Sequence, residues 1–215
     1  MQRARLLLGD DHALILEGLR TLLADDFEIA GIATNGRDLV DAAQHLKPDA
    51  VVLDVSMPLL NGMDAARQIH KLLPRTKIVF LTQRSEREYV KMALQIGASA
   101  YLVKQSITDE LIPAIRSALA GKVYVTPQVA GAPAAALEAQ SGENYADWFK
   151  SSITPRQREV IQLVAEGKSI KEIAGILNVS VKTVEFHKAN LMNRLSLRST
   201  AELTRYAVKH GIVEC

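Results

Sequence analysis

The most restrictive feature of this chain is a fivefold alternation of a short apolar run with a segment of helical spacing. The runs, all within residues 1–122, read ARLLLG, FEIAGIA, DAVVLD, KIVFLT and SAYLVK. Short apolar runs predict strands buried on both faces, and the segments between them predict crossover helices. The first such segment carries its apolar residues at Leu14, Leu16, Leu19, Leu22 and Leu23. The pattern therefore predicts a doubly wound α/β fold with a five-stranded parallel sheet.

Polar residues stand at the ends of four of the five runs. Asp10 and Asp11 follow the first run, and the third, fourth and fifth runs end at Asp54, Thr82 and Lys104. Because the carboxyl ends of parallel strands meet at one edge of a sheet, we expect these side chains to lie together. A single aspartate could simply cap a helix or begin a turn. Five such explanations would be needed for the whole set, so we interpret it as one site.

The residue types in this set indicate its chemistry. Three carboxylates at close range repel one another and favour a hard divalent cation, and Mg²⁺ takes oxygen ligands while it keeps several waters and a phosphate oxygen. A carboxylate beside Mg²⁺ can attack a phosphorus centre. The Lys104 ammonium and the Thr82 hydroxyl can then stabilise the phosphoryl oxygens. This reasoning favours Asp54 as the nucleophile.

Residues 1–122 resemble the receiver domain of two-component response regulators, which has a flavodoxin-like fold. The matching positions are Asp10, Asp11, Asp54, Met57, Pro58, Gly62, Thr82, Tyr101 and Lys104. The resemblance implies that Asp54 is the phosphoacceptor and that the backbone carbonyl of Ser56 completes a magnesium site. It also implies that Asp11 binds the metal directly and Asp10 through water.

The same resemblance implies a switch formed by Thr82 and Tyr101, in which the hydroxyl moves to the phosphoryl group and the ring turns inward. Gln83 departs from the receiver pattern, because receivers usually carry a small residue after the threonine. Its longer side chain is expected either to restrict access to Asp54 or to change the lifetime of the phosphorylated state. Flavodoxin-type cofactor binding is disfavoured, since DDH follows the first strand where a phosphate loop would need hydroxyl groups and glycine.

Residues 150–215 predict a small all-α domain of four helices. The helix-end signals are Thr154, Pro155, Gln157 and Gly167 for the first helix, Ser169 and Glu172 for the second, and Ser180 for the third. Capping boxes and a proline at the first helical position are typical of helix starts. The second and third helices are joined through LNVS and indicate a helix-turn-helix motif.

The third helix, VKTVEFHKANLMNRL, divides into two faces. Its apolar stripe holds Val184, Leu191 and Leu195, and its opposite face holds Lys182, Glu185, Phe186, Ala189 and Asn193. An exposed phenylalanine is either a scattered surface aromatic or a contact to a thymine methyl group in the major groove. Lys182 suits guanine or phosphate, and Glu185 can accept a hydrogen bond from cytosine. His187 is not expected to bind a metal, because no second ligand stands at a suitable spacing.

The stretch from Thr154 to Leu203 resembles the DNA-binding domain of the LuxR family. With the receiver in front of it, the chain resembles a response regulator of the NarL/FixJ type, which implies binding to double-stranded DNA. The side chains suited to the DNA backbone are Thr183, Lys188, Arg194 and Arg198. The fourth helix, at about residues 199–209, is implied to form a dimer contact.

Charge is distributed unevenly along the chain. The formal net charge is 0 over residues 1–122, −3 over residues 123–149 and +5 over residues 150–215. A part that meets a polyanion is expected to carry such positive charge, although an ordinary solvated surface can carry it too. The middle part predicts a linker, with a short helix through AAALEAQ. Three aromatic residues follow at helical spacing, Tyr145, Trp148 and Phe149. We expect them to dock on the second domain or, alternatively, on the first.

Composition excludes several classes of protein. The single cysteine, Cys215, leaves no disulfide framework and no cysteine-rich metal site. No run reaches the roughly 18 apolar residues of a membrane span. The first apolar run is interrupted too early to serve as a signal peptide. We expect a protein of the bacterial cytoplasm with no membrane partner.

The function expected from these observations is phosphorylation-controlled regulation of transcription, not enzymatic turnover. A sensor histidine kinase is the expected phosphoryl donor, and the phosphorylated chain is expected to form a homodimer. A stand-alone aspartyl phosphotransferase or phosphatase is disfavoured, because no Asp-x-Asp-x-Thr/Val motif surrounds Asp54. A constitutive DNA binder with a degenerate receiver is disfavoured by the intact acidic pair, Thr82 and Lys104.

Overall fold

The computed structural model describes residues 3–130 and 153–213 of the chain. They form two compact units, one containing β1 to α6 and the other α9 to α12. The predicted helix through AAALEAQ and the residues Tyr145, Trp148 and Phe149 lie outside the described residues. Within the described ranges no helix is both long and apolar enough to cross a bilayer.

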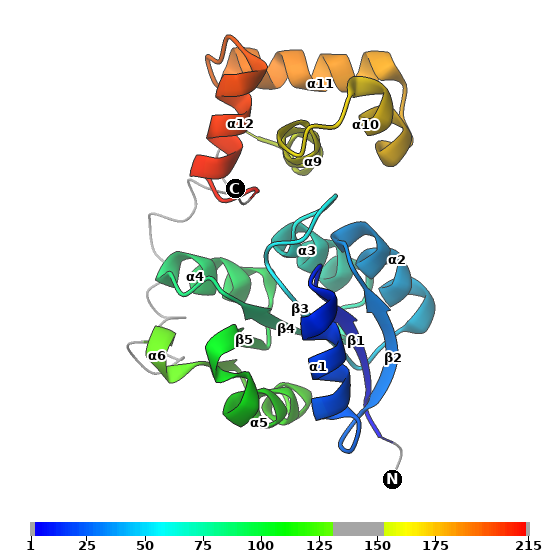
Figure 1. Ribbon diagram of the computed structural model, residues 1–215, viewed down its shortest axis with the longest axis vertical. Coiled ribbons are helices and arrows are strands. Elements are labelled where there is room, and N and C mark those ends of the chain that lie inside the picture. Colours follow the sequence, from blue (N-terminus) through cyan, green and yellow to red (C-terminus); the bar gives the residue numbers. More distant parts are fainter. Residues whose placement is uncertain (1–2, 131–152, 214–215) are drawn as a thin grey trace. The chain divides into compact units, whose positions relative to one another are not determined.

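The first unit is a parallel sheet with helices on both faces (Figure 1). Its strands are β1 (Arg5–Gly9), β2 (Glu28–Ala33), β3 (Ala50–Leu53), β4 (Lys77–Thr82), β5 (Ala100–Val103) and β6 (Tyr124–Val125). Its helices are α1 (Ala13–Leu23), α2 (Gly36–Leu46), α3 (Gly62–Leu72), α4 (Arg87–Ile96), α5 (Ile107–Leu119) and α6 (Pro127–Ala130), with a 3₁₀ turn at Lys104–Ser106. The strand order β2-β1-β3-β4-β5-β6 confirms the doubly wound fold.

Among the described residues the sheet has six strands, so the prediction of five strands was wrong by one. Tyr124 and Val125 pair in parallel with Ala100 and Tyr101 of β5. A two-residue strand has no alternation of its own that a sequence pattern could detect. It forms here because the edge of β5 offers unpaired backbone groups.

The core on one face of the sheet packs α1 and α5 against alternate strand residues. Its fully or almost fully buried members include Leu6, Leu8, Val52, Val79, Leu81, Leu102, Leu111 and Ile115. On α1, Leu16, Leu19 and Leu23 are buried as the helical spacing predicts. Leu14, in the first turn of α1, is instead 85% exposed, so the spacing pattern was wrong at this position. The neighbouring pairs α2 with α3 and α3 with α4 are in contact.

The described residues of the second unit form four helices, as predicted. They are α9 (Pro155–Ala165), α10 (Ile170–Leu177), α11 (Val181–Arg194) and α12 (Thr200–Lys209). Both predicted capping boxes are formed, and the Ser180 side chain accepts a hydrogen bond from the backbone of Thr183. Gly167 follows α9 with a φ of 79°, a conformation that favours glycine. Asn178, also left-handed, begins the turn that joins α10 to α11.

Candidate functional site

The sequence-predicted polar residues meet at the carboxyl edge of the sheet. Asp10 follows β1 and Asp54 follows β3, and these strands pair in parallel with Gly9 opposite Leu53. The backbone N–H of Asp54 donates to the carbonyl of Gly9 at 2.9 Å, which brings the two aspartates side by side. Lys104 follows β5, and its Nζ lies 2.7 Å from Oδ2 of Asp10 and 2.7 Å from Oδ2 of Asp54.

Burial sets the electrostatics of this centre. Asp10 is 1% exposed and Asp54 is 4% exposed. Burial raises the pKa of the Asp54 carboxyl above its ordinary value, although the hydrogen bond and charge of Lys104 oppose the shift. Burial alone would lower the pKa of the Lys104 ammonium, but its hydrogen bonds to Asp10 and Asp54 outweigh that effect and raise it. The centre therefore holds a buried cation shared by two carboxylates.

The acidic cluster offers ligand atoms for a metal ion. Atoms of Asp10, Asp11, His12 and Asp54 all lie within 4.8 Å of one another. Oδ1 of Asp54 is buried and makes no hydrogen bond within the described part of the chain. Since a buried carboxylate oxygen normally has a partner, this atom fits a role as a ligand or a nucleophile. Hard oxygen donors of this kind suit Mg²⁺.

His12 is a member of the cluster that the sequence reasoning missed. Its Nδ1 lies 3.1 Å from Oδ1 of Asp10 and 2.8 Å from Oδ1 of Asp11. The hydrogen bond to Asp10 and the negative charge of Asp11 raise the pKa of the imidazole. The available signal was its position directly after the acidic pair.

The predicted switch residues lie next to this centre. Thr82 is 1% exposed, and its Oγ1 accepts a hydrogen bond of 3.2 Å from the backbone of Arg84. The Tyr101 ring is fully buried beside Phe80, and its hydroxyl donates to the carbonyl of Arg84 at 2.8 Å. Burial raises the pKa of Tyr101. Thr82 and Tyr101 thus contact the same short backbone segment, and Gln83, which lies within it, is exposed.

The loop after β3 closes tightly onto the candidate nucleophile. The backbone N–H of Gly62 donates to the carbonyl of Val55 at 2.8 Å. A Cβ at Gly62 would overlap the backbone carbonyl of Asp54, so only glycine fits. The sequence reasoning matched Gly62 without seeing this close approach. Ser56 lies half-buried in the same loop, and its role as a carbonyl ligand stays a prediction.

In the second unit, α11 presents the face that the sequence predicted. Val184 and Leu191 are fully buried and Leu195 is partly buried. The residues on the opposite face that are exposed are Lys182, Glu185, Phe186, Ala189 and Asn193. Phe186 is 62% exposed, an unusual position for a large aromatic side chain.

The residues expected at the DNA backbone have differing surroundings. Nζ of Lys188 donates to Oγ1 of Thr200 at 2.9 Å, which links α11 to the start of α12. Oγ1 of Thr183 lies 2.8 Å from Oγ of Ser180 and so belongs to the helix cap. The exposed residues Arg194 and Arg198 lie at and beyond the end of α11.

Arg156 is a structural residue that the sequence reasoning missed. Its guanidinium donates to the carbonyl of Leu177, the last residue of α10, at 2.6 Å and to Glu159 at 2.9 Å. It thereby ties the start of α9 to the turn before α11.

Comparison with known families agrees with this arrangement. Residues 6–116 match the response regulator receiver domain, and residues 151–207 match the luxR family of bacterial regulatory proteins. The chain belongs to the response regulators that join a receiver domain to a LuxR-type helix-turn-helix domain. It is accordingly a DNA-binding response regulator.

Relatives match along almost the whole chain. The transcriptional regulatory protein MctR of Rhizobium johnstonii is 35% identical over 98% of this chain and 96% of its own length. The oxygen regulatory protein NreC of Staphylococcus aureus is 34% identical over 98% of this chain and 99% of its own. A solved structure of the RcsB response regulator of Salmonella typhimurium has 25% identity and a TM-score of 0.57, covering 96% of this chain and 98% of that one.

Proposed function

We propose that Asp54 accepts a phosphoryl group and that this modification controls dimerisation and DNA binding by residues 150–215. The observation that carries the proposal is the buried Oδ1 of Asp54, which has no hydrogen-bond partner among the described residues, while Oδ2 of the same carboxylate lies 2.7 Å from Nζ of Lys104. The donor is a phosphohistidine of a sensor kinase. A carboxylate oxygen of Asp54 forms the new P–O bond as the P–N bond breaks and the imidazole leaves. The chain is itself modified and does not turn over a second substrate. It acts in the bacterial cytoplasm.

The surrounding residues are placed to assist this step. The Lys104 ammonium is already desolvated, so its attraction for developing charge on the phosphoryl oxygens is stronger than it would be in water. The Thr82 hydroxyl, buried at the end of the adjacent β4, is the second donor. A bound Mg²⁺ supplies further neutralisation of the phosphoryl oxygens. The groups assigned to hold it are the carboxylates of Asp10, Asp11 and Asp54 and the carbonyl of Ser56.

DNA recognition is assigned to α11. Its exposed residues Lys182, Glu185, Phe186 and Ala189 are proposed to contact base edges in the major groove of double-stranded DNA. Thr183, Lys188, Arg194 and Arg198 are proposed to contact phosphates. The net charge of +5 over residues 150–215 favours approach to DNA. Helix α12 is the proposed dimer contact.

The phosphorylation proposal is tested by incubation with acetyl phosphate and MgCl₂, followed by intact-mass analysis. We expect one hydroxylamine-sensitive phosphate on the wild type and none on Asp54→Asn, which keeps the side-chain shape. Asp41→Asn, which alters an exposed carboxylate of α2, is the matched control and should label like the wild type. Equal labelling of Asp54→Asn, or full labelling in excess chelator, would contradict the assignment.

A further inference from the structure

The segment after α5, residues 122–130, forms ordered structure within the first unit, and we refer to it as the strap. It contains β6, which pairs with β5, and α6, which contacts α4 (Figure 1). Val125 is 8% exposed and Val129 is 5% exposed. From the sequence this segment was expected to be the start of a linker. In the structure its strand β6 instead lies along β5, the strand that Lys104 follows.

Thr126 is the residue by which the strap holds β5. Its side chain is fully buried, and its backbone N–H donates to the carbonyl of Tyr101 at 3.0 Å. Strand β6 ends at Val125, so it offers no backbone carbonyl to the next N–H group along β5, that of Val103. The side-chain hydroxyl of Thr126 takes the place of that carbonyl and accepts a hydrogen bond of 3.4 Å from the backbone N–H of Val103. Val103 is 2% exposed, and without this acceptor its N–H would be buried and unsatisfied.

The two residues that Thr126 holds lie at or next to the parts of β5 that serve the site. Val103 directly precedes Lys104, whose ammonium bridges Asp10 and Asp54. Tyr101 donates through its hydroxyl to Arg84, two residues beyond Thr82. A change in the position of the Lys104 backbone must therefore be accommodated by the hydrogen bonds of Thr126.

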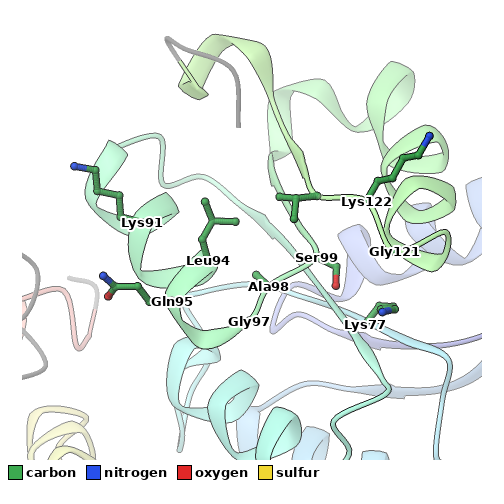
Figure 2. A pocket seen from close by; sticks show the side chains of 10 residues that line it. Lys77, Lys91, Leu94, Gln95, Gly97, Ala98, Ser99, Gly121 and Lys122 are labelled. Carbon is green, nitrogen blue, oxygen red and sulfur yellow. The ribbon is translucent and has the colours of Figure 1, made fainter. Parts of the chain in front are cut away.

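The start of the strap is less tightly packed than its end. A cavity of about 350 Å³ opens between the second half of α4 and the start of the strap (Figure 2). Among its lining residues are Leu94 and Gln95 of α4 and Gly121, Lys122 and Val123. The start of the strap therefore borders open space, whereas Val125 and Thr126 are buried.

We infer that Thr126 is a positioning residue that couples the phosphoacceptor centre to the strap and so to the chain leading to the DNA-binding domain. This inference rests on the proposed phosphorylation of Asp54. A phosphoryl group that binds Lys104 and Thr82 orders the end of β5, and Thr126 passes that ordering to β6 and α6. Coupling of this kind is reciprocal, so loss of the Thr126 hydroxyl must alter the behaviour of the phosphorylated centre.

The test compares three variants of the full-length protein. Thr126→Val removes the hydroxyl while keeping a β-branched side chain of similar size. Thr126→Ser keeps the hydroxyl. Thr76→Val is the matched control, since Thr76 is also buried and its hydroxyl donates to the carbonyl of Pro48 at 2.8 Å. This contact lies just before the amino ends of β4 and β3, away from the strand ends that carry the site.

Two quantities are measured for each protein. The first is the half-life of the acetyl phosphate-derived label on Asp54. The second is amide hydrogen exchange of residues 122–130 with and without beryllofluoride, a phosphoryl mimic. In the wild type, beryllofluoride should slow exchange of the Thr126 amide about three- to tenfold, the range that corresponds to one buried hydrogen bond.

In Thr126→Val the half-life of the label on Asp54 should change about threefold or more, since one net hydrogen bond is lost. The slowing of amide exchange at residue 126 by beryllofluoride should disappear. Thr126→Ser and Thr76→Val should behave like the wild type. The inference is overturned if Thr126→Val keeps both wild-type properties, or if Thr76→Val changes them equally. If Thr126→Val does not fold, the wild type alone tests the inference. A Thr126 amide whose exchange rate is the same with and without beryllofluoride would overturn it. Absence of label on the wild type would instead contradict the proposed phosphorylation, and this inference with it.

Discussion

Gly62 shows at the scale of one residue how the backbone shapes the phosphoacceptor. Its Cα packs against the backbone carbonyl of Asp54 with no room for a Cβ. Gly62→Ala should therefore lower the free energy of unfolding by about 3 kcal/mol and reduce labelling of Asp54, because the loop must move outward.

Gly18→Ala is the matched control for this change. Gly18 lies within α1, and a Cβ there would meet nothing within 4 Å. The substitution should stabilise the protein by up to about 1 kcal/mol, since alanine favours helix more than glycine does. Chemical denaturation measures both variants. An equally stable Gly62→Ala with normal labelling would show that the loop is looser than described.

His12 gives a pH-dependent prediction at the same scale. The hydrogen bond to Asp10 and the charge of Asp11 raise its pKa above the ordinary value of 6.5 in the folded protein. The stability that it contributes is therefore fully present below pH 6.5 and is lost as the pH rises through the folded-state pKa.

Nuclear magnetic resonance titration of the metal-free protein should find this raised pKa. Asp11→Asn should lower it, because one of the two negative charges is removed. Added Mg²⁺ should lower it as well, since the cation and the proton compete for the same carboxylates. A pKa at or below the ordinary value in the metal-free wild type would refute the described geometry.

At the scale of elements, α11 is expected to divide its contacts between bases and phosphates. Phe186→Ala should flatten the preference at one or two operator positions, because a base contact contributes roughly 1 to 3 kcal/mol of discrimination. Lys188→Ala should weaken binding to all sites about equally and make the salt dependence shallower by about one unit. Binding to an operator and its single-base variants at two salt concentrations measures both effects.

Thr200→Val separates the proposed phosphate contact of Lys188 from its hydrogen bond to Thr200. It removes the hydroxyl to which the Lys188 ammonium donates and leaves the charge in place. If Lys188 contacts phosphate, Thr200→Val should retain the salt dependence that Lys188→Ala loses.

Uniform weakening of all sites by Phe186→Ala, or no effect at all, would mean that the exposed ring does not contact bases.

The elements also show what sequence could and could not predict. Strong local signals gave both capping boxes, the helix-turn-helix and the carboxylates at the strand ends, because each depends on neighbouring residues or on the rule for parallel sheets. The strand β6 and the hydrogen bonds of Thr126 depend on pairing with β5, which is distant in sequence. The contacts of Arg156 and Gly62 likewise arise only from tertiary packing.

At the scale of the whole molecule, two units with separate cores are joined through residues 131–149, whose formal net charge is −3. A tethered domain acts on its neighbour at high effective concentration. We therefore expect a fragment of residues 151–215 to bind DNA more tightly than the unphosphorylated full-length chain at the same salt concentration. Equal affinities would exclude inhibition by the receiver.

The central claim is that phosphorylation of Asp54 controls DNA binding, and one binding measurement tests it most directly. DNA sites are first selected from a random library with residues 151–215. The affinity of the full-length protein for those sites is then measured with and without acetyl phosphate and Mg²⁺, for the wild type and for Asp54→Asn. We predict that phosphorylation tightens binding by the wild type about tenfold, a coupling of about 1.4 kcal/mol, and leaves Asp54→Asn unchanged. Identical affinities of the labelled and unlabelled wild type would contradict the account.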